Sequence, residues 1–141
     1  MRSRTLIWIN FFFATLVVVG VFLQTYFIAA YFSGAGEGAL DAHAVTGGIV
    51  VHGAELLVFL SALIGYWRVW RWVGWSFLLL LIGTVQIFLS PPDEDPLSGW
   101  VHGLHGLLAL FVLVIASVIA HHGLKVLRRT EPALVSGPPA P

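Results

Sequence analysis

Four long apolar runs dominate the pattern of this chain. They lie at about residues 6–32, 44–67, 72–89 and 100–120. Each approaches or exceeds the ~20 residues that an α-helix needs to cross a hydrocarbon core of about 30 Å. Backbone groups in lipid must be paired within their own segment, so runs of this length are expected to be helices. The pattern predicts an all-α, membrane-spanning four-helix domain over residues 1–129 and a disordered, proline-rich tail at 130–141.

Short polar connections separate the runs, so consecutive helices should be antiparallel neighbours in an up-down-up-down bundle. All basic residues fall at one end of this bundle: Arg2, Arg4, Arg68, Arg71, Lys125, Arg128 and Arg129. The positive-inside rule then places the N- and C-termini in the cytoplasm of a multi-pass protein of the cell's inner (plasma) membrane. A cleaved signal peptide is the alternative interpretation of residues 6–32, but this apolar stretch exceeds the usual core of 7–15 residues.

The composition agrees with lipid as the solvent, because 58% of the residues are hydrophobic and only 10% are charged. The formal net charge is zero, which gives no indication of a nucleic-acid partner. The chain has no cysteine, so disulfides, iron–sulfur clusters and thiolate metal sites are excluded. Met1 is the single methionine, and any metal or redox centre would therefore need histidine ligands.

Each predicted span carries a polar side chain in its outer half. These residues are His43, His52, Gln24, Gln86, His102 and His105. Polar groups inside a membrane are costly, tend to face the bundle interior and suggest a functional site. The alternative is a structural or interfacial role, since glutamine also joins helices by hydrogen bonds. His121 and His122 close the inner end of the last helix and are expected to be interfacial.

Two imidazoles from facing helices can bind a haem iron from opposite sides, and bundle cores are common places for such cofactors. His105 is the first ligand that we expect, with His52 or His43 opposite. Equal depth favours pairing His52 with His105, or His43 with His102. His43 and His52 are nine residues apart, which on a regular α-helix is 180° around the axis. Several glycines beside these histidines would leave room for a flat macrocycle.

Two further features accompany the histidines. A weak internal repeat, H-x-x-x-G, opens the second span at His43 and the fourth at His102. Glu55 is the single carboxylate inside a span and shares a helix face with His52, three residues earlier. We expect Glu55 to be protonated, paired with a histidine or directed into a wet cavity.

The segments around His43 (Ala42-His43-Ala-Val-Thr-Gly47) and His105 (Leu104-His105-Gly-Leu-Leu) resemble those of an uncharacterised family of small actinobacterial four-helix membrane proteins. The layout also resembles one four-helix half of the haem A synthase family, in which histidines on the second and fourth helices bind haem. The resemblance to the actinobacterial family favours His43 and His105 as the pair. Glu55 follows His52, whereas the haem A synthase pattern has E-x-x-H, so that family's hydroxylation chemistry is not implied.

The leading hypothesis is a b-type haem-binding membrane protein with bis-histidine ligation of haem b near the outer face, serving electron transfer or haem handling. Its partners would be the lipid bilayer and a membrane redox partner or a second copy of the chain. One alternative is a non-enzymatic accessory subunit of a membrane complex. Another is a small metal-ion or transport protein that uses His105, His52 and His43 as metal ligands. No nucleophile–base pair, phosphate loop or H-E-x-x-H motif supports hydrolytic or nucleotide chemistry.

Overall fold

The computed structural model describes residues 4–89 and 99–129, apart from the side chains of residues 101 and 102, and all secondary structure in these ranges is helical. The first helical run is α1 (Arg4–Ala30) with a π-helical end, η1 (Tyr31–Ala35). The second run consists of α2 (Glu37–Val45), the π-helical segment η2 (Thr46–Val51) and α3 (His52–Gly65). It is followed by α4 (Trp70–Phe88) and α5 (Gly99–Arg129). The all-α fold class is confirmed.

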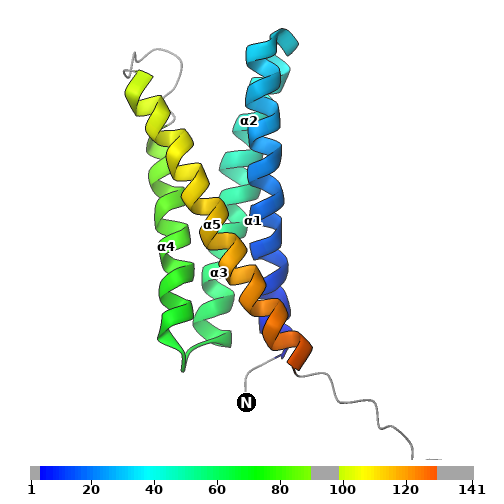
Figure 1. The fold of residues 1–141 in the computed structure, drawn as a ribbon, viewed down its shortest axis with the longest axis vertical. Coiled ribbons are helices and arrows are strands. Elements are labelled where there is room, and N and C mark those ends of the chain that lie inside the picture. Colours follow the sequence, from blue (N-terminus) through cyan, green and yellow to red (C-terminus); the bar gives the residue numbers. More distant parts are fainter. Residues whose placement is uncertain (1–3, 90–98, 130–141) are drawn as a thin grey trace, which may run out of the picture.

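The four runs lie side by side as antiparallel neighbours, and α1 begins at the end of the molecule where α5 finishes (Figure 1). α1 packs against α3 and α5, and α4 packs against the same two helices, so the bundle closes on itself. Gly34 and Gly36 have φ angles of 93° and 81° in the first connection. Glycine reaches this left-handed region without strain, which allows the tight turn from η1 into α2.

Four helices are long and apolar enough to cross a membrane: Arg4–Ala35, Glu37–Gly65, Trp70–Phe88 and Gly103–Arg129. They correspond to the four apolar runs. The second helix begins earlier than the predicted run, at Glu37, because a polar helical turn precedes the apolar residues. The fourth continues to Arg129, because its basic end remains helical after the apolar stretch stops.

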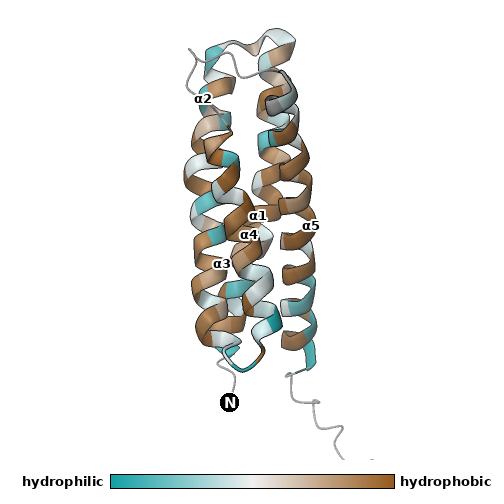
Figure 2. Ribbon diagram, turned by 90° about the vertical axis from the view of Figure 1, so that its left-hand side faces the viewer, coloured by the Kyte–Doolittle hydropathy of each residue, from teal (hydrophilic) through white to brown (hydrophobic). Residues whose placement is uncertain are grey.

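The bundle has apolar side chains on its outside and several polar ones within. Phe22, Phe77 and Leu110 are among many large hydrophobic residues that are more than half exposed. Figure 2 shows the corresponding hydrophobic colouring over the middle of the helices. Asn10, by contrast, is fully buried and donates from its amide to the Val58 carbonyl of α3 at 2.8 Å. Such an arrangement suits a bundle surrounded by lipid, where interhelical hydrogen bonds help to join helices.

The buried core occupies the half of the bundle nearer the N-terminus. Among the described residues, burial in α1 ends at Val21 and in α4 at Gly83, whereas in α5 it begins at Val112. In the second run, Val51 is the buried residue farthest from the N-terminal end of the bundle, since none is buried in α2. Figure 1 shows the α1–α2 pair standing apart from the α4–α5 pair at the opposite end. The polar residues predicted as a functional layer lie at that end.

Candidate functional site

Gln24 of α1 and His43 of α2 form two hydrogen bonds with each other's backbone. The Gln24 side-chain amide donates to the His43 carbonyl at 3.1 Å, and His43 Nδ1 lies 3.0 Å from the Gln24 carbonyl oxygen. Gly47 makes this contact possible, because a Cβ atom at that position would overlap the Gln24 amide. The first two helical runs are therefore joined at the level of the histidine ring.

Gln86 of α4 and His105 of α5 repeat this arrangement. The Gln86 side-chain amide donates to the His105 carbonyl at 2.9 Å, and His105 Nδ1 lies 3.2 Å from the Gln86 carbonyl oxygen. The glutamine and histidine are 19 residues apart in both pairs. The chain thus contains two helix pairs with the same glutamine–histidine contacts, each carrying one histidine. By these contacts His43 corresponds to His105, whereas the H-x-x-x-G repeat aligned His43 with His102.

These contacts determine which nitrogen of each ring carries the proton. A carbonyl oxygen only accepts hydrogen bonds, so Nδ1 of His43 and of His105 must be the donor. In the neutral imidazole the lone pair then resides on Nε2, the atom through which such a ring can bind a metal. Metal-binding histidines commonly have their other nitrogen held by a backbone carbonyl or carboxylate in this way.

The rings of His43 and His105 lie close to each other across the bundle. The centroids of His43 and His105 are 6.4 Å apart, and the ring planes are inclined by 56°. An imidazole nitrogen binds a metal at about 2 Å, which puts the ring centre about 3 Å from the metal, so two opposed ligands have centres about 6 Å apart. Both side chains are partly exposed. The separation of the ring centroids and the tautomer of both rings therefore fit two imidazoles that share one metal.

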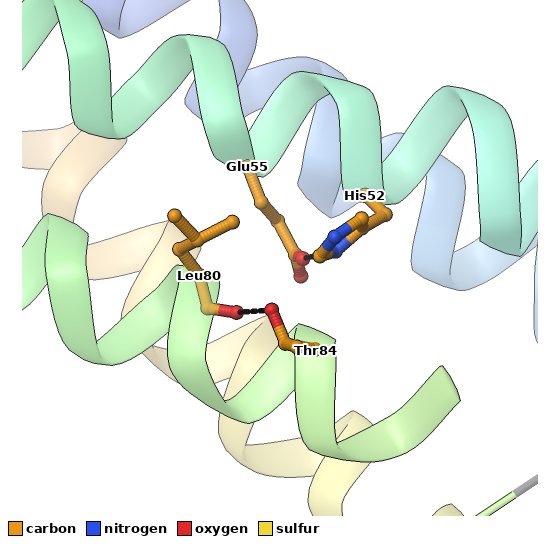
Figure 3. Close-up of polar contacts among 4 residues, drawn as sticks. All are labelled: His52, Glu55, Leu80 and Thr84. Atoms are coloured by element: carbon orange, nitrogen blue, oxygen red, sulfur yellow. Dashed lines mark hydrogen bonds and ion pairs between the residues drawn. The ribbon is translucent and has the colours of Figure 1, made fainter. Parts of the chain in front are cut away.

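His52 has a different partner. Its Nδ1 lies 3.0 Å from Oε2 of Glu55, whose side chain is only 1% exposed. Figure 3 shows both side chains extending from α3, with the Glu55 carboxyl group directed toward α4 near Leu80 and Thr84. Gly83 of α4 provides the space, since a Cβ atom there would overlap the Glu55 carboxyl group. Of the three expectations for Glu55, the structure therefore corresponds to pairing with a histidine.

The pairing of histidines differs from the depth argument. The ring opposite His105 is that of His43, as the resemblance to the actinobacterial family implied, and His52 is engaged by Glu55. The separate expectation that His43 and His52 lie 180° apart around the axis assumed a regular α-helix between them, but η2 is π-helical. A π-helical turn holds more residues, and each extra residue changes the facing direction by about 100°. The side chain of His102 lies outside the described residues.

The histidines at the other end are not part of this layer. The His122 ring stacks on Trp72, with centroids 3.6 Å apart and planes inclined by 12°, while His121 is exposed.

The sequence did not predict two features of the site. Gly47 leaves room for the Gln24 amide and Gly83 for the Glu55 carboxyl group. Each glutamine also bonds with the backbone and ring of a histidine. The identical spacing of Gln24 to His43 and Gln86 to His105 was the signal that could have revealed it.

Comparisons with protein-family models, with curated proteins and with solved structures found no match to this chain.

Proposed function

We propose that this chain is an inner-membrane protein that binds haem b through His43 and His105 near the outer face. Four helices of sufficient length and hydropathy support the membrane location. The confinement of all basic residues to one end supports cytoplasmic N- and C-termini. The observation that carries the proposal is the 6.4 Å separation of two imidazole rings whose Nδ1 atoms are already held by backbone carbonyls.

The residues of the chain would each have a defined task. His43 and His105 would hold the haem iron through Nε2, and the backbone carbonyls of Gln24 and Gln86 would keep each ring in the tautomer that leaves Nε2 without a proton. Val21, Val51 and Val112, at the outer limit of the buried core, would exclude water from the inner side. When bound, haem iron supplies one-electron redox chemistry, or the haem is itself the molecule being handled.

The test is the reduced-minus-oxidised absorption spectrum of the purified protein after haem supplementation. We expect a b-type, low-spin bis-histidine spectrum in the unaltered protein, and its loss in His43→Ala and His105→Ala. His52→Ala is the matched control, because it removes a histidine of the same layer that is paired with Glu55, and it should retain the spectrum. Loss in His52→Ala alone, or a protein that takes up no haem, would contradict the assignment.

A metal ion is the second candidate ligand, and the charge of the outer end favours it. Glu37 and Asp41 are exposed acids on α2, the helix that carries His43, and a carboxylate-rich surface attracts cations. Within residues 4–89 and 99–129, apart from the side chains of 101 and 102, no third His, Asp or Glu joins the two imidazoles, and such a pair suits a low-coordinate ion such as Cu(I). Elemental analysis showing stoichiometric copper or zinc, with no haem spectrum, would support this candidate. If neither ligand is retained, an accessory subunit of a membrane complex becomes the better interpretation.

A further inference from the structure

Glu55 is a buried acid whose two carboxyl oxygens have different surroundings. Its side chain is 1% exposed, and Oε2 lies 3.0 Å from Nδ1 of His52. Oε1 is buried and has no hydrogen-bond partner within the described residues. Gly83 of α4 admits the carboxyl group, because a Cβ atom there would overlap it. An ionisable group is costly inside a membrane span and by default indicates a functional site.

His52 is the titratable group that meets Glu55. The elements α1, η2 and α4 pack against α3, and their charged or titratable residues are all exposed, namely Arg4, Tyr26 and Arg71. α5 has no acid, and its His105 is bonded to Gln86. In the described part of the chain, a protonated His52 is therefore the one cation that pairs with an ionised Glu55. Because an unpaired buried charge is costly, the two groups together favour holding one proton.

Protons reach the carboxyl group from one direction. The His52 side chain is 27% exposed and follows Val51, beyond which no residue of α2 is buried. On the other side of Glu55, Val58 and Leu79 are fully buried and apolar. Figure 3 shows the His52 ring beside the Glu55 carboxyl group. An imidazole has two nitrogens that can each gain or lose a proton, so it can pass protons to a group behind it.

We propose that Glu55 and His52 form a proton-binding site, in which the imidazole carries protons between water and the buried carboxyl group. In the unloaded site, Nδ1 of His52 donates to the Glu55 carboxylate. During loading a hydronium ion gives a proton to Nε2 and leaves as water, while the Nδ1 proton passes to Oε2. The products are a neutral carboxylic acid and a neutral imidazole protonated on Nε2, and release reverses these steps. The site is separate from the proposed haem ligands.

Infrared spectroscopy of the full-length protein in nanodiscs tests the proposal, because a protonated carboxyl group has a C=O band that a carboxylate lacks. The Glu55 band is identified as the one that is absent from the Glu55→Gln variant. We expect this band to weaken when the pH is raised and to shift when water is replaced by heavy water. A Glu55 band that is missing at every pH, or that fails either change, would overturn the proposal.

Histidine variants separate carrying a proton from holding the carboxyl group in place. His52→Gln retains an amide that can donate to Oε2 but cannot pass a proton on. The heavy-water shift should become slower by about tenfold or more, since a positioned acid–base group contributes about 10²–10⁴-fold to proton transfer. Imidazole added to His52→Ala should restore a fast shift. His121→Gln, at an exposed histidine of the other end, is the control and should leave the rate unchanged.

Unaltered exchange in His52→Gln, or no recovery of His52→Ala with imidazole, would show that His52 does not carry the proton. These measurements require no haem. A protein that fails to bind haem but shows the Glu55 band and its exchange would contradict the proposed function alone, and the reverse result would contradict the proton site alone.

Discussion

At the scale of single residues, the neighbouring glycines Gly47 and Gly48 have different surroundings. A methyl group at Gly47 would overlap the amide of Gln24, whereas at Gly48 nothing lies within 4 Å of the added carbon. Gly47→Ala should therefore displace the Gln24 amide from the His43 carbonyl. An interhelical hydrogen bond in a membrane contributes about 0.6 kcal/mol on average and up to about 1.7.

We expect Gly47→Ala to weaken haem binding by about three- to fifteenfold, the equivalent of that lost bond. Gly48→Ala raises helix propensity by the same amount, about 1 kcal/mol, but does not displace the Gln24 amide. The Gly48→Ala protein should therefore bind haem with unchanged affinity. Haem titration of the two purified variants measures this difference. Equal affinities would mean that the Gln24–His43 contact has no part in positioning the ligand.

Several of these residues were predictable from the apolar pattern, but that pattern does not say which of them meet; the equal spacing of 19 residues from each glutamine to its histidine is the one further signal. Gln24, Gln86, His43 and His105 stand out because polar groups are rare in apolar spans. Which of them meet depends on how each helix is rotated about its axis. The π-helical segment η2 changes that rotation between His43 and His52. The residues of Thr46–Val51 show no sequence pattern from which a π-helix could be predicted. The small size of Gly83 likewise has meaning only once Glu55 is known to lie against it.

At the scale of helices, the molecule is built from two equivalent pairs, α1 with α2 and α4 with α5. Each is joined by a glutamine that donates to the backbone of a histidine 19 residues later. Equivalent contacts should have similar energies. Gln24→Ala and Gln86→Ala are therefore expected to lower haem affinity by comparable factors, again about three- to fifteenfold.

The matched control is Thr25→Val. Thr25 is next to Gln24 but its hydroxyl bonds the Val21 carbonyl of its own helix at 3.0 Å, so its removal leaves the joint between helices intact. Affinity should stay within about twofold of the unaltered protein, since a bond within one helix turn does not position a neighbouring helix. A large effect in only one of the two glutamine variants would show that the helix pairs are not energetically equivalent.

The helices themselves follow from the sequence more directly than their ends do. Four long apolar runs suffice to predict four helices, because lipid leaves few other structures for such segments. The beginning of α2 at Glu37 and the end of α5 at Arg129 are polar, and hydropathy therefore carries no information about them. The same polar ends hold charges on which the expected topology depends.

At the scale of the whole molecule, charge is segregated along the bundle axis. Basic residues gather where α1 begins and α5 finishes, and exposed acids lie on α2 at the other end. The lack of native cysteine allows single reporter thiols to be introduced without background. Ser33 in η1 and Arg129 at the end of α5 are both exposed and belong to opposite ends.

A membrane-impermeant maleimide added to spheroplasts should label Ser33→Cys at once and Arg129→Cys only after the membrane is permeabilised. The reason is that Lys and Arg near the ends of spans are retained in the cytoplasm, and removing Arg129 leaves six such residues on that side. The reverse order of labelling would put the histidine pair at the cytoplasmic face. The proposed haem site would then be open to the cytoplasm, so this orientation decides from which side haem reaches it.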